Sequence, residues 1–257
     1  MYLESRRCWC LFVVPQGNPM AVALDPSLLS TIVSERKLDG DTSLQFRSGN
    51  VYTGELADQT TMHGAGIYRW SSAGVTYAGE FASNKLTGRG KYSWADGSTY
   101  EGELRAGVRH GVGTFSGPGG HPKYEGQWVE GRRHGKGMLT YSDGGDVYEG
   151  EFANDQREGS GTLTHGSGNS YTGQWVADQK CGQGVFEWRD RRERYTGQWH
   201  DGKPHGQGEH IWLRRQLEAS PFQLQERYAP AANHTVPHPL SAPHRVAPIP
   251  ARPCLPR

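Results

Sequence analysis

The sequence predicts an all-β fold, an elongated single-sheet antiparallel β-meander solenoid made of stacked hairpins. A Tyr-x-Gly motif occurs seven times between residues 52 and 197, at steps of 23 to 25 residues, and Gly-x-Gly follows each copy. Beyond the second glycine, apolar residues such as Tyr68 and Trp70 alternate with polar ones, which is the period of a strand with one buried face. Turn pairs such as Asp96-Gly97 separate the strands. Each copy is therefore expected to be two short strands and two turns.

The composition indicates a narrow core. Hydrophobic residues make up only 34% of the 257 residues, whereas glycine numbers 36, roughly twice its ordinary share. The 8 Trp, 12 Tyr and 7 Phe are too many for a disordered linker. We expect large rings to fill the space beside closely approaching backbones, where a glycine avoids the clash that a Cβ would cause.

Three positions carry the same residue types in every copy: the tyrosine, the glycine two residues later, and an aromatic residue or leucine two further on. We predict that these positions hold the fold together, and the sequence assigns no residue to ligand binding. The structural positions are Tyr52, Gly54, Tyr77, Gly79, Tyr100, Gly102, Tyr124, Gly126, Trp128, Tyr148, Gly150, Tyr171, Gly173, Trp175, Tyr195, Gly197 and Trp199.

The repeated unit resembles the MORN repeat (membrane occupation and recognition nexus). The resemblance rests on Tyr-x-Gly-Glu/Gln-aromatic, then Gly-x-Gly and an Asp-Gly-type turn, in seven consecutive copies over residues 52–212. Residues 38–51 are interpreted as the second half of an earlier, degraded copy, in which Leu44 and Phe46 alternate before the turn into Tyr52. The resemblance implies a row of hairpins whose surface binds other molecules.

The ends of the chain lie outside the repeats. We expect a flexible N-terminus over residues 1–24, with a cleaved signal peptide as the alternative, because Arg6-Arg7 precedes an apolar run. Residues 25–51 are predicted to hold a short capping helix and the half repeat, since Asp25-Pro26-Ser27 is a helix start. The apolar stripe of that helix would be Leu28, Leu29, Ile32 and Val33.

Residues 213–257 form a Pro-rich tail that we expect to be disordered. Nine of the 15 prolines lie between Pro221 and Pro256. The switch from strict repeats to this composition suggests an alternative terminus of a longer repeat array.

One column of histidines stands just before Gly-x-Gly, at His63, His110, His134 and His205. Equivalent residues of neighbouring copies are expected roughly 10 Å apart, since each copy contributes two strands. Zinc ligands lie about 2 Å from the ion, so we expect a turn-stabilising or surface role and no metal.

Paired carboxylates such as Glu101/Glu103 and Glu149/Glu151 lie two residues apart and hence on one face of a strand. They recur as repeat positions, so a solvated face is expected rather than a glycosidase pair. The chain contains no nucleophile elbow and no dinucleotide fingerprint before a helix. We therefore expect no catalytic residue, no cofactor and no enzyme activity.

The charge distribution bears on the partner. Of 28 basic and 27 acidic residues, residues 1–51 hold five of each and residues 213–257 hold six and two. The repeats keep 17 and 20, a net charge of −3, which argues against nucleic acid and disfavours an anionic membrane as partner.

The resemblance extends to radial spoke head proteins of motile cilia, through segments such as 96–103 and 109–115. It implies a cytoplasmic structural or scaffolding protein that docks subunits of a ciliary or flagellar axoneme or another cytoskeletal assembly. The alternatives are a membrane-apposing phospholipid-binding module and a regulatory adaptor for a kinase or a small GTPase.

Overall fold

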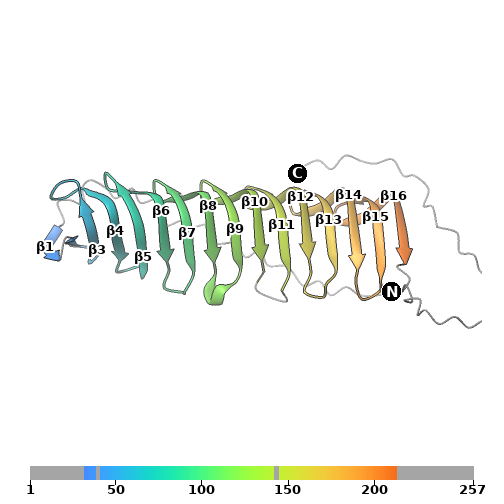
Figure 1. The fold of residues 1–257 in the computed structure, drawn as a ribbon, viewed down its shortest axis with the longest axis horizontal. Helices are drawn as coiled ribbons and strands as arrows, with labels where there is room; N and C mark the ends of the chain where they lie inside the picture. The colour runs from blue at the N-terminus through green and yellow to red at the C-terminus, as the bar shows by residue number, and fades with distance from the viewer. Residues whose placement is uncertain (1–31, 39–40, 142–144, 213–257) are drawn as a thin grey trace, which may run out of the picture. The chain divides into compact units, whose positions relative to one another are not determined.

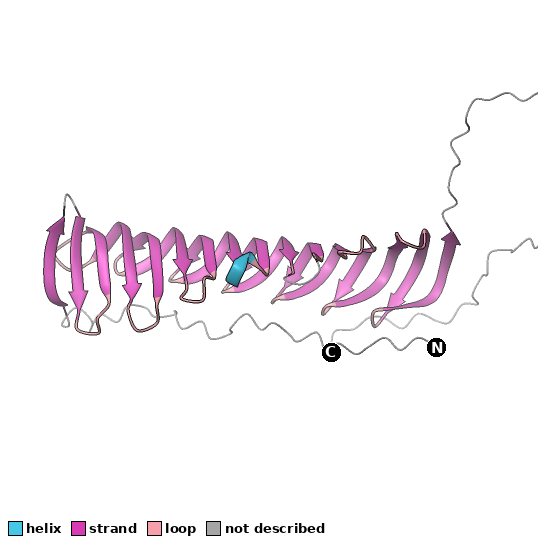
Figure 2. Cartoon of the chain, turned by 90° about the horizontal axis from the view of Figure 1, so that it is seen from below, coloured by secondary structure: helices cyan, strands magenta, loops and turns pink. Residues whose placement is uncertain are grey.

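A computed structural model describes residues 32–38, 41–141 and 145–212. These residues form antiparallel strands joined by turns, with one 3-10 turn, η2 (Pro118–Gly120), in this part of the chain (Figures 1 and 2). The strands are β1 (Ile32–Leu38), β2 (Asp41–Phe46), β3 (Val51–Leu56), β4 (Met62–Trp70), β5 (Val75–Ala82), β6 (Lys85–Ser93), β7 (Thr99–Arg105), β8 (Val108–Ser116), β9 (Lys123–Val129), β10 (Arg132–Thr140), β11 (Val147–Ala153), β12 (Gln156–Thr164), β13 (Ser170–Val176), β14 (Gln179–Trp188), β15 (Glu193–His200) and β16 (Lys203–Trp212).

The strands form an antiparallel sheet in which their order is the order of the sequence. This arrangement confirms the predicted all-β meander. The chain divides into two compact units, Met1–Gly120 with Gln127–Arg132, and His121–Gly126 with Arg133–Arg257, which we call unit 1 and unit 2. Each unit is described by itself.

The side of the sheet that carries the repeat tyrosines is called the tyrosine face. In unit 1 it includes Tyr52, Tyr77 and Tyr100, each with no exposed surface, and in unit 2 it includes Tyr148 and Tyr171, equally buried. The registers Gly54↔Gly66, Gly79↔Gly90, Gly150↔Gly161 and Gly173↔Gly184 align the glycines of neighbouring strands beside these rings. The core is therefore a single layer of side chains that lies against glycine backbone.

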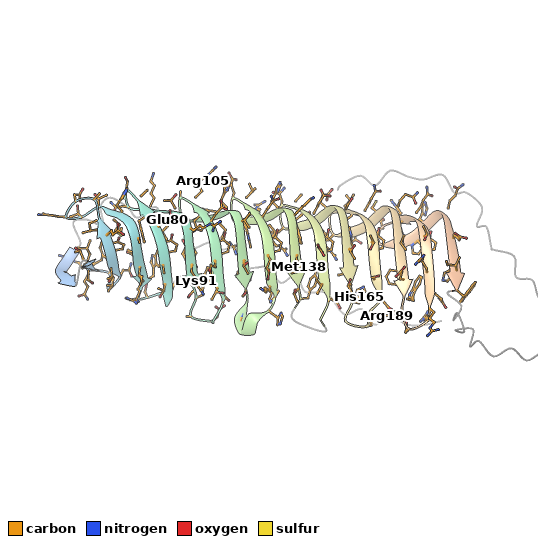
Figure 3. All side chains as sticks on the ribbon, in the orientation of Figure 1. Glu80, Lys91, Arg105, Met138, His165 and Arg189 are labelled. Atoms are coloured by element: carbon orange, nitrogen blue, oxygen red, sulfur yellow. The ribbon has the colours of Figure 1, made fainter. Side chains whose placement is uncertain are left out.

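Six hairpins of the described residues turn through two residues that both have a positive φ. The first residue has φ between +47° and +50° and the second between +63° and +81°, as in Asn154-Asp155 and Ala177-Asp178. Such type I′ turns match the twist of the paired strands, and Asn, Asp or Gly tolerates the second position best. Figure 3 shows Arg105 of unit 1 at the edge where these short turns lie, and His165 and Arg189 of unit 2 at the edge with the longer turns.

The N-terminal helix prediction is wrong at Ile32 and Val33. Both residues belong to β1, which pairs with β2, and β-branched side chains favour a strand over a helix. Residues 25–31, where that helix was expected to start, lie outside the described residues, as do the N-terminal segment 1–24 and the tail 213–257. In the half repeat, Leu44 and Phe46 are buried in β2 and the turn at Ser48-Gly49 leads into β3.

Candidate partner-binding surface

The repeat tyrosines lie beside glycine backbone, and six of them are held at the hydroxyl. The hydroxyl donates a hydrogen bond to the carbonyl oxygen three residues later, over 2.5 to 3.1 Å, in Tyr52, Tyr77, Tyr100, Tyr148, Tyr171 and Tyr195. A Cβ on Gly161, the second glycine of its Gly-x-Gly, would approach the Tyr148 hydroxyl to 2.3 Å. That glycine is therefore required by the ring above it.

The third repeated position packs edge-on against these tyrosines. In unit 2 the Trp175 ring lies 5.3 Å from Tyr148 and 5.1 Å from Tyr171, both nearly perpendicular. The Trp175 indole also donates to the Gly161 carbonyl of the preceding repeat at 3.0 Å. Trp199 does the same with Tyr171 and Gly184. An aromatic residue thus closes its own repeat onto the previous one, with a geometry that favours ring pairs.

The first glycine of Gly-x-Gly sits in a register shift between the two strands of a repeat. In β12 the shift follows Gly150↔Gly161, and Gly159 has φ +64°, a conformation that glycine adopts without a steric penalty. The amide of Ser160 then points to the Glu151 carboxylate, which accepts its hydrogen bond at 3.2 Å. Equivalent bonds of 2.9 to 3.4 Å come from Ala65, Arg89, Val112, Gln183 and Gln207.

A row of cations lies over the rings of the tyrosine face. In unit 2, Arg133 covers Phe152 at 5.3 Å, Arg157 covers Trp175 at 4.2 Å, and Lys180 lies 4.5 Å from the Phe186 centroid. We call these three cations the cation row. Stacking of this kind is favourable because the face of an aromatic ring is electron-rich.

In unit 1 the same column position holds Met62, Leu86 and Arg109. Met62 and Leu86 are buried, and Arg109 lies 4.4 Å over Trp128. The column therefore changes from apolar to basic within unit 1.

Turn carboxylates orient two members of the cation row. Asp155 accepts hydrogen bonds from the Arg133 amide at 2.9 Å and from its Nε at 3.2 Å. Asp178 holds Arg157 in the same way, at 3.0 and 2.8 Å. At Lys180 the equivalent turn residue is Gly202, whose amide donates to the Lys180 carbonyl at 3.1 Å.

Comparison with known protein families identifies MORN repeats at residues 61–75, 77–99, 100–121, 124–146, 148–170, 171–191 and 195–212. The chain belongs to the MORN repeat family. The first matched segment begins at residue 61, inside the copy that the sequence analysis starts at Tyr52, and the other six coincide with predicted copies. A comparison with curated proteins finds no match. No helix of the described residues has the length and apolarity to span a bilayer.

The aromatic positions of the MORN repeats lie in the core, as expected from the sequence. Trp128 and Trp175 are each 2% exposed, because neighbouring rings and the stems of the cations cover them. The partly exposed groups of the tyrosine face in unit 2 include the cation row, Phe186 and Trp188. The cation row was missed from the sequence, although basic residues two positions before Gly-x-Gly in consecutive repeats were a usable signal.

The paired carboxylates of the MORN repeats have two different roles. Glu103 and Glu151 accept the bulge amides, whereas Glu101 is exposed and forms a 3.4 Å ion pair with Lys91. Glu101, Glu149 and Glu151 are exposed and Glu103 is partly exposed, which agrees with the expected solvated face. The bonds from the bulge amides to Glu103 and Glu151 are an additional role that the sequence analysis did not predict.

The histidine column does not converge. His63 and His134 are exposed and His110 is partly exposed. In the final repeat, His205 has a buried Nε2 without a hydrogen-bond partner, and its ring centroid lies 5.5 Å from that of His200. Across residues 32–38, 41–141 and 145–212, no three His, Cys, Asp or Glu side chains come together in a way that could hold a metal ion.

Removal of one bulge acceptor tests the role of the Glu/Gln column. We expect Glu151→Ala to lower the free energy of unfolding by about 0.5–1.5 kcal/mol, because the Ser160 amide loses its acceptor. Glu151→Gln should retain most of that stability, since Gln174 and Gln198 fill the same role naturally. Chemical denaturation measures the difference. Glu149→Ala is the control, and an equal loss there would contradict the assignment.

Burial raises the pKa of the tyrosines above the ordinary value of 10, and to about 12 for Tyr171. Burial is also the largest cause at Tyr77, Tyr100 and Tyr148. The folded state keeps these phenols neutral where the unfolded chain ionises them. Their contribution to stability is therefore complete below pH 10 and is lost as the pH rises through the folded-state pKa.

We accordingly expect the melting temperature to fall steeply from about pH 10 to pH 12, with several protons released per molecule on unfolding. Thermal melts across this range, with phenolate absorbance as a second signal, provide the measurement. Tyr171→Phe should release fewer protons at the transition. A melting temperature that is constant up to pH 12 would show that the fold does not raise the pKa of these phenols.

Proposed function

We propose that the chain is a non-catalytic scaffold whose MORN repeats dock partner proteins through the tyrosine face. The observation that carries the proposal is the cation row of unit 2, fixed over aromatic rings and partly exposed beside Phe186 and Trp188. Arg and aromatic side chains dominate the binding energy of protein interfaces, and a preordered side chain loses little entropy on binding.

The class of partner and its location follow from the resemblance to radial spoke head proteins. We infer subunits of an axonemal or cytoskeletal complex as partners and the cytoplasm, at a cilium or flagellum, as the location. The net charge of −3 on residues 52–212 supports a protein partner over nucleic acid or an anionic membrane.

The test compares protein capture with lipid binding across salt. The full chain should retain axonemal or cytoskeletal subunits from a ciliated-cell lysate when salt rises from about 50 to about 500 mM, because buried contacts are screened little. It should not float with vesicles that contain phosphatidylserine. Tight vesicle binding that is lost in high salt would contradict the proposal and favour the phospholipid-binding alternative.

A pair of variants locates the surface. Lys180→Met keeps the aliphatic stem over Phe186 and removes the cation, so affinity for the captured subunit should fall about tenfold. Lys136→Met makes the same change at an exposed position of β10 away from the cation row. It should leave affinity unchanged. Equal effects of the two changes would move the binding site away from the tyrosine face.

A further inference from the structure

The last strand of unit 2 has a bare edge within the described residues. β16 pairs with β15, and no described strand follows it. Trp212 at its end is 66% exposed, the highest value among the exposed large hydrophobic residues of the described chain. An uncovered edge with an exposed tryptophan would accept another strand.

The tyrosine of the last repeat is incompletely covered. Tyr148 packs between Phe152 of its own strand and Trp175 of the following repeat. Tyr195 is in ring contact with Trp199 of its own strand, and it is partly exposed where the earlier repeat tyrosines are 0 to 1% exposed. The missing contact is the one that the next repeat supplies elsewhere, an aromatic ring opposite the first glycine of Gly-x-Gly.

At the other end of the chain, a strand without the repeat motif covers the edge. β1 has the sequence IVSERKL, which contains neither Tyr-x-Gly nor Gly-x-Gly, and it pairs with β2 over Ile32↔Phe46 to Leu38↔Asp41. This array therefore accepts a degenerate strand at an edge. Solenoids in general need such capping elements.

The tail contains one segment that fits the bare edge. Residues 222–228 read FQLQERY, with apolar Phe222, Leu224 and Tyr228 at alternating positions and no proline. This spacing is that of a strand with one buried face. Leu224 and Tyr228 are four residues apart, the same distance as Tyr195 and Trp199.

One antiparallel register brings the segment into agreement with the repeats. With Phe222 opposite Trp212, Leu224 falls opposite His210 and Tyr228 falls opposite Gly206. Within the repeats, the residue opposite the equivalent glycine is the covering aromatic, as in Gly159↔Trp175 and Gly182↔Trp199. Tyr228 would then stand where an eighth repeat would place the ring that covers Tyr195.

The same register is acceptable at the other positions. Glu226 falls opposite Gly208, where a repeat has glycine. That glycine is required by the second strand of its own hairpin, since a Cβ on Gly173 would lie 2.6 Å from Gly184 Cα and 2.7 Å from the Gln183 carbonyl. An edge strand has no second strand behind it. On the other face, Arg227 lies opposite Gln207 and Gln225 opposite Glu209, so no like charges meet.

We propose that residues 222–228 pair with β16 as an antiparallel edge strand, with Tyr228 covering Tyr195. This assignment replaces the expected disorder for that part of the tail. The nine residues 213–221 suffice to return the chain to β16, since the paired ends of two strands lie about 5 Å apart. Because the segment is tethered to the strand that it covers, its effective concentration there exceeds that of a separate molecule.

Amide hydrogen exchange of the full chain tests the proposal. We expect the amides of β16 to exchange at least about tenfold faster in a Leu224→Ser/Tyr228→Ser variant than in the wild type. Gln223→Ser/Gln225→Ser is the matched control, because it changes the same segment on its other face, and it should leave β16 protected. The amides of β13, far from the edge in the strand order, serve as the internal reference.

Two results would overturn the proposal. Exchange of β16 that is equal in the wild type and the Leu224/Tyr228 variant would show that the segment does not cover the edge. Protection that is independent of those residues but rises with protein concentration would assign the edge to a second copy of the chain. Accelerated exchange in β13 as well would indicate general unfolding. In that case the test is Tyr228→Phe, which keeps the covering ring. This variant must show wild-type protection of the β16 amides, and faster exchange there would also overturn the proposal.

Discussion

Replacement of Trp175 by alanine is expected to lower the free energy of unfolding by about 3–5 kcal/mol. The indole is 2% exposed, packs against two repeat tyrosines, and donates to the Gly161 carbonyl. Its loss leaves a cavity, removes the hydrogen bond to the Gly161 carbonyl and removes the nearer of the two rings under the Arg157 guanidinium. Trp128→Ala in unit 1 should have a similar cost, since that indole donates to Gly113 and lies under Arg109.

Thermal and chemical denaturation measure these losses. Met138→Ala is the control, because Met138 is 36% exposed and its truncation removes less buried surface than the loss of either indole. Melts of the tryptophan variants that match wild type within error would show that these rings do not form the core.

Gly161→Ala is expected to cost about 1–3 kcal/mol, and more if the ring cannot move, through overpacking alone. The new Cβ would lie 2.3 to 2.7 Å from atoms of the Tyr148 ring, which is held by its hydroxyl bond and by two perpendicular aromatic neighbours. The cost is steric, since Gly161 does not have the positive φ of Gly159.

A double-mutant cycle isolates this clash. In a Tyr148→Leu background the ring is gone, so Gly161→Ala should cost much less than it does in the wild type. Chemical denaturation of the four proteins gives the coupling free energy. Additive effects would mean that the glycine is required for a reason other than the tyrosine.

The repeat columns predict the strands because two independent periods coincide in them. The 23- to 25-residue recurrence locates the hairpins, and the alternation after Gly-x-Gly identifies the buried face. The role of Glu151 could not be predicted in this way. It depends on the register shift beside Gly150, which frees the Ser160 amide, and no residue pattern encodes that geometry directly.

The sequence also could not predict which groups of the docking surface are exposed. The repeated rings were expected in the core, where Trp175 lies, but the sequence did not reveal that Arg157 covers that ring and presents a cation at the surface. The end of the chain shows a similar limit. Ile32 and Val33 have helical spacing with Leu28 and Leu29, and only the pairing of β1 with β2 decides between helix and strand.

The turn amides have a consequence for how such a chain can change in length. Gly107 donates to Leu86, Asp155 to Arg133, Asp178 to Arg157 and Gly202 to Lys180, so each turn is bonded to the repeat before it. Gain or loss of one whole copy preserves every such bond, because the same donor meets the same acceptor at the new junction. Insertion of a single residue within a strand moves all later side chains to the opposite face. These bonds therefore permit a change in copy number, whereas a change in the length of a strand would disrupt the buried face of every later copy.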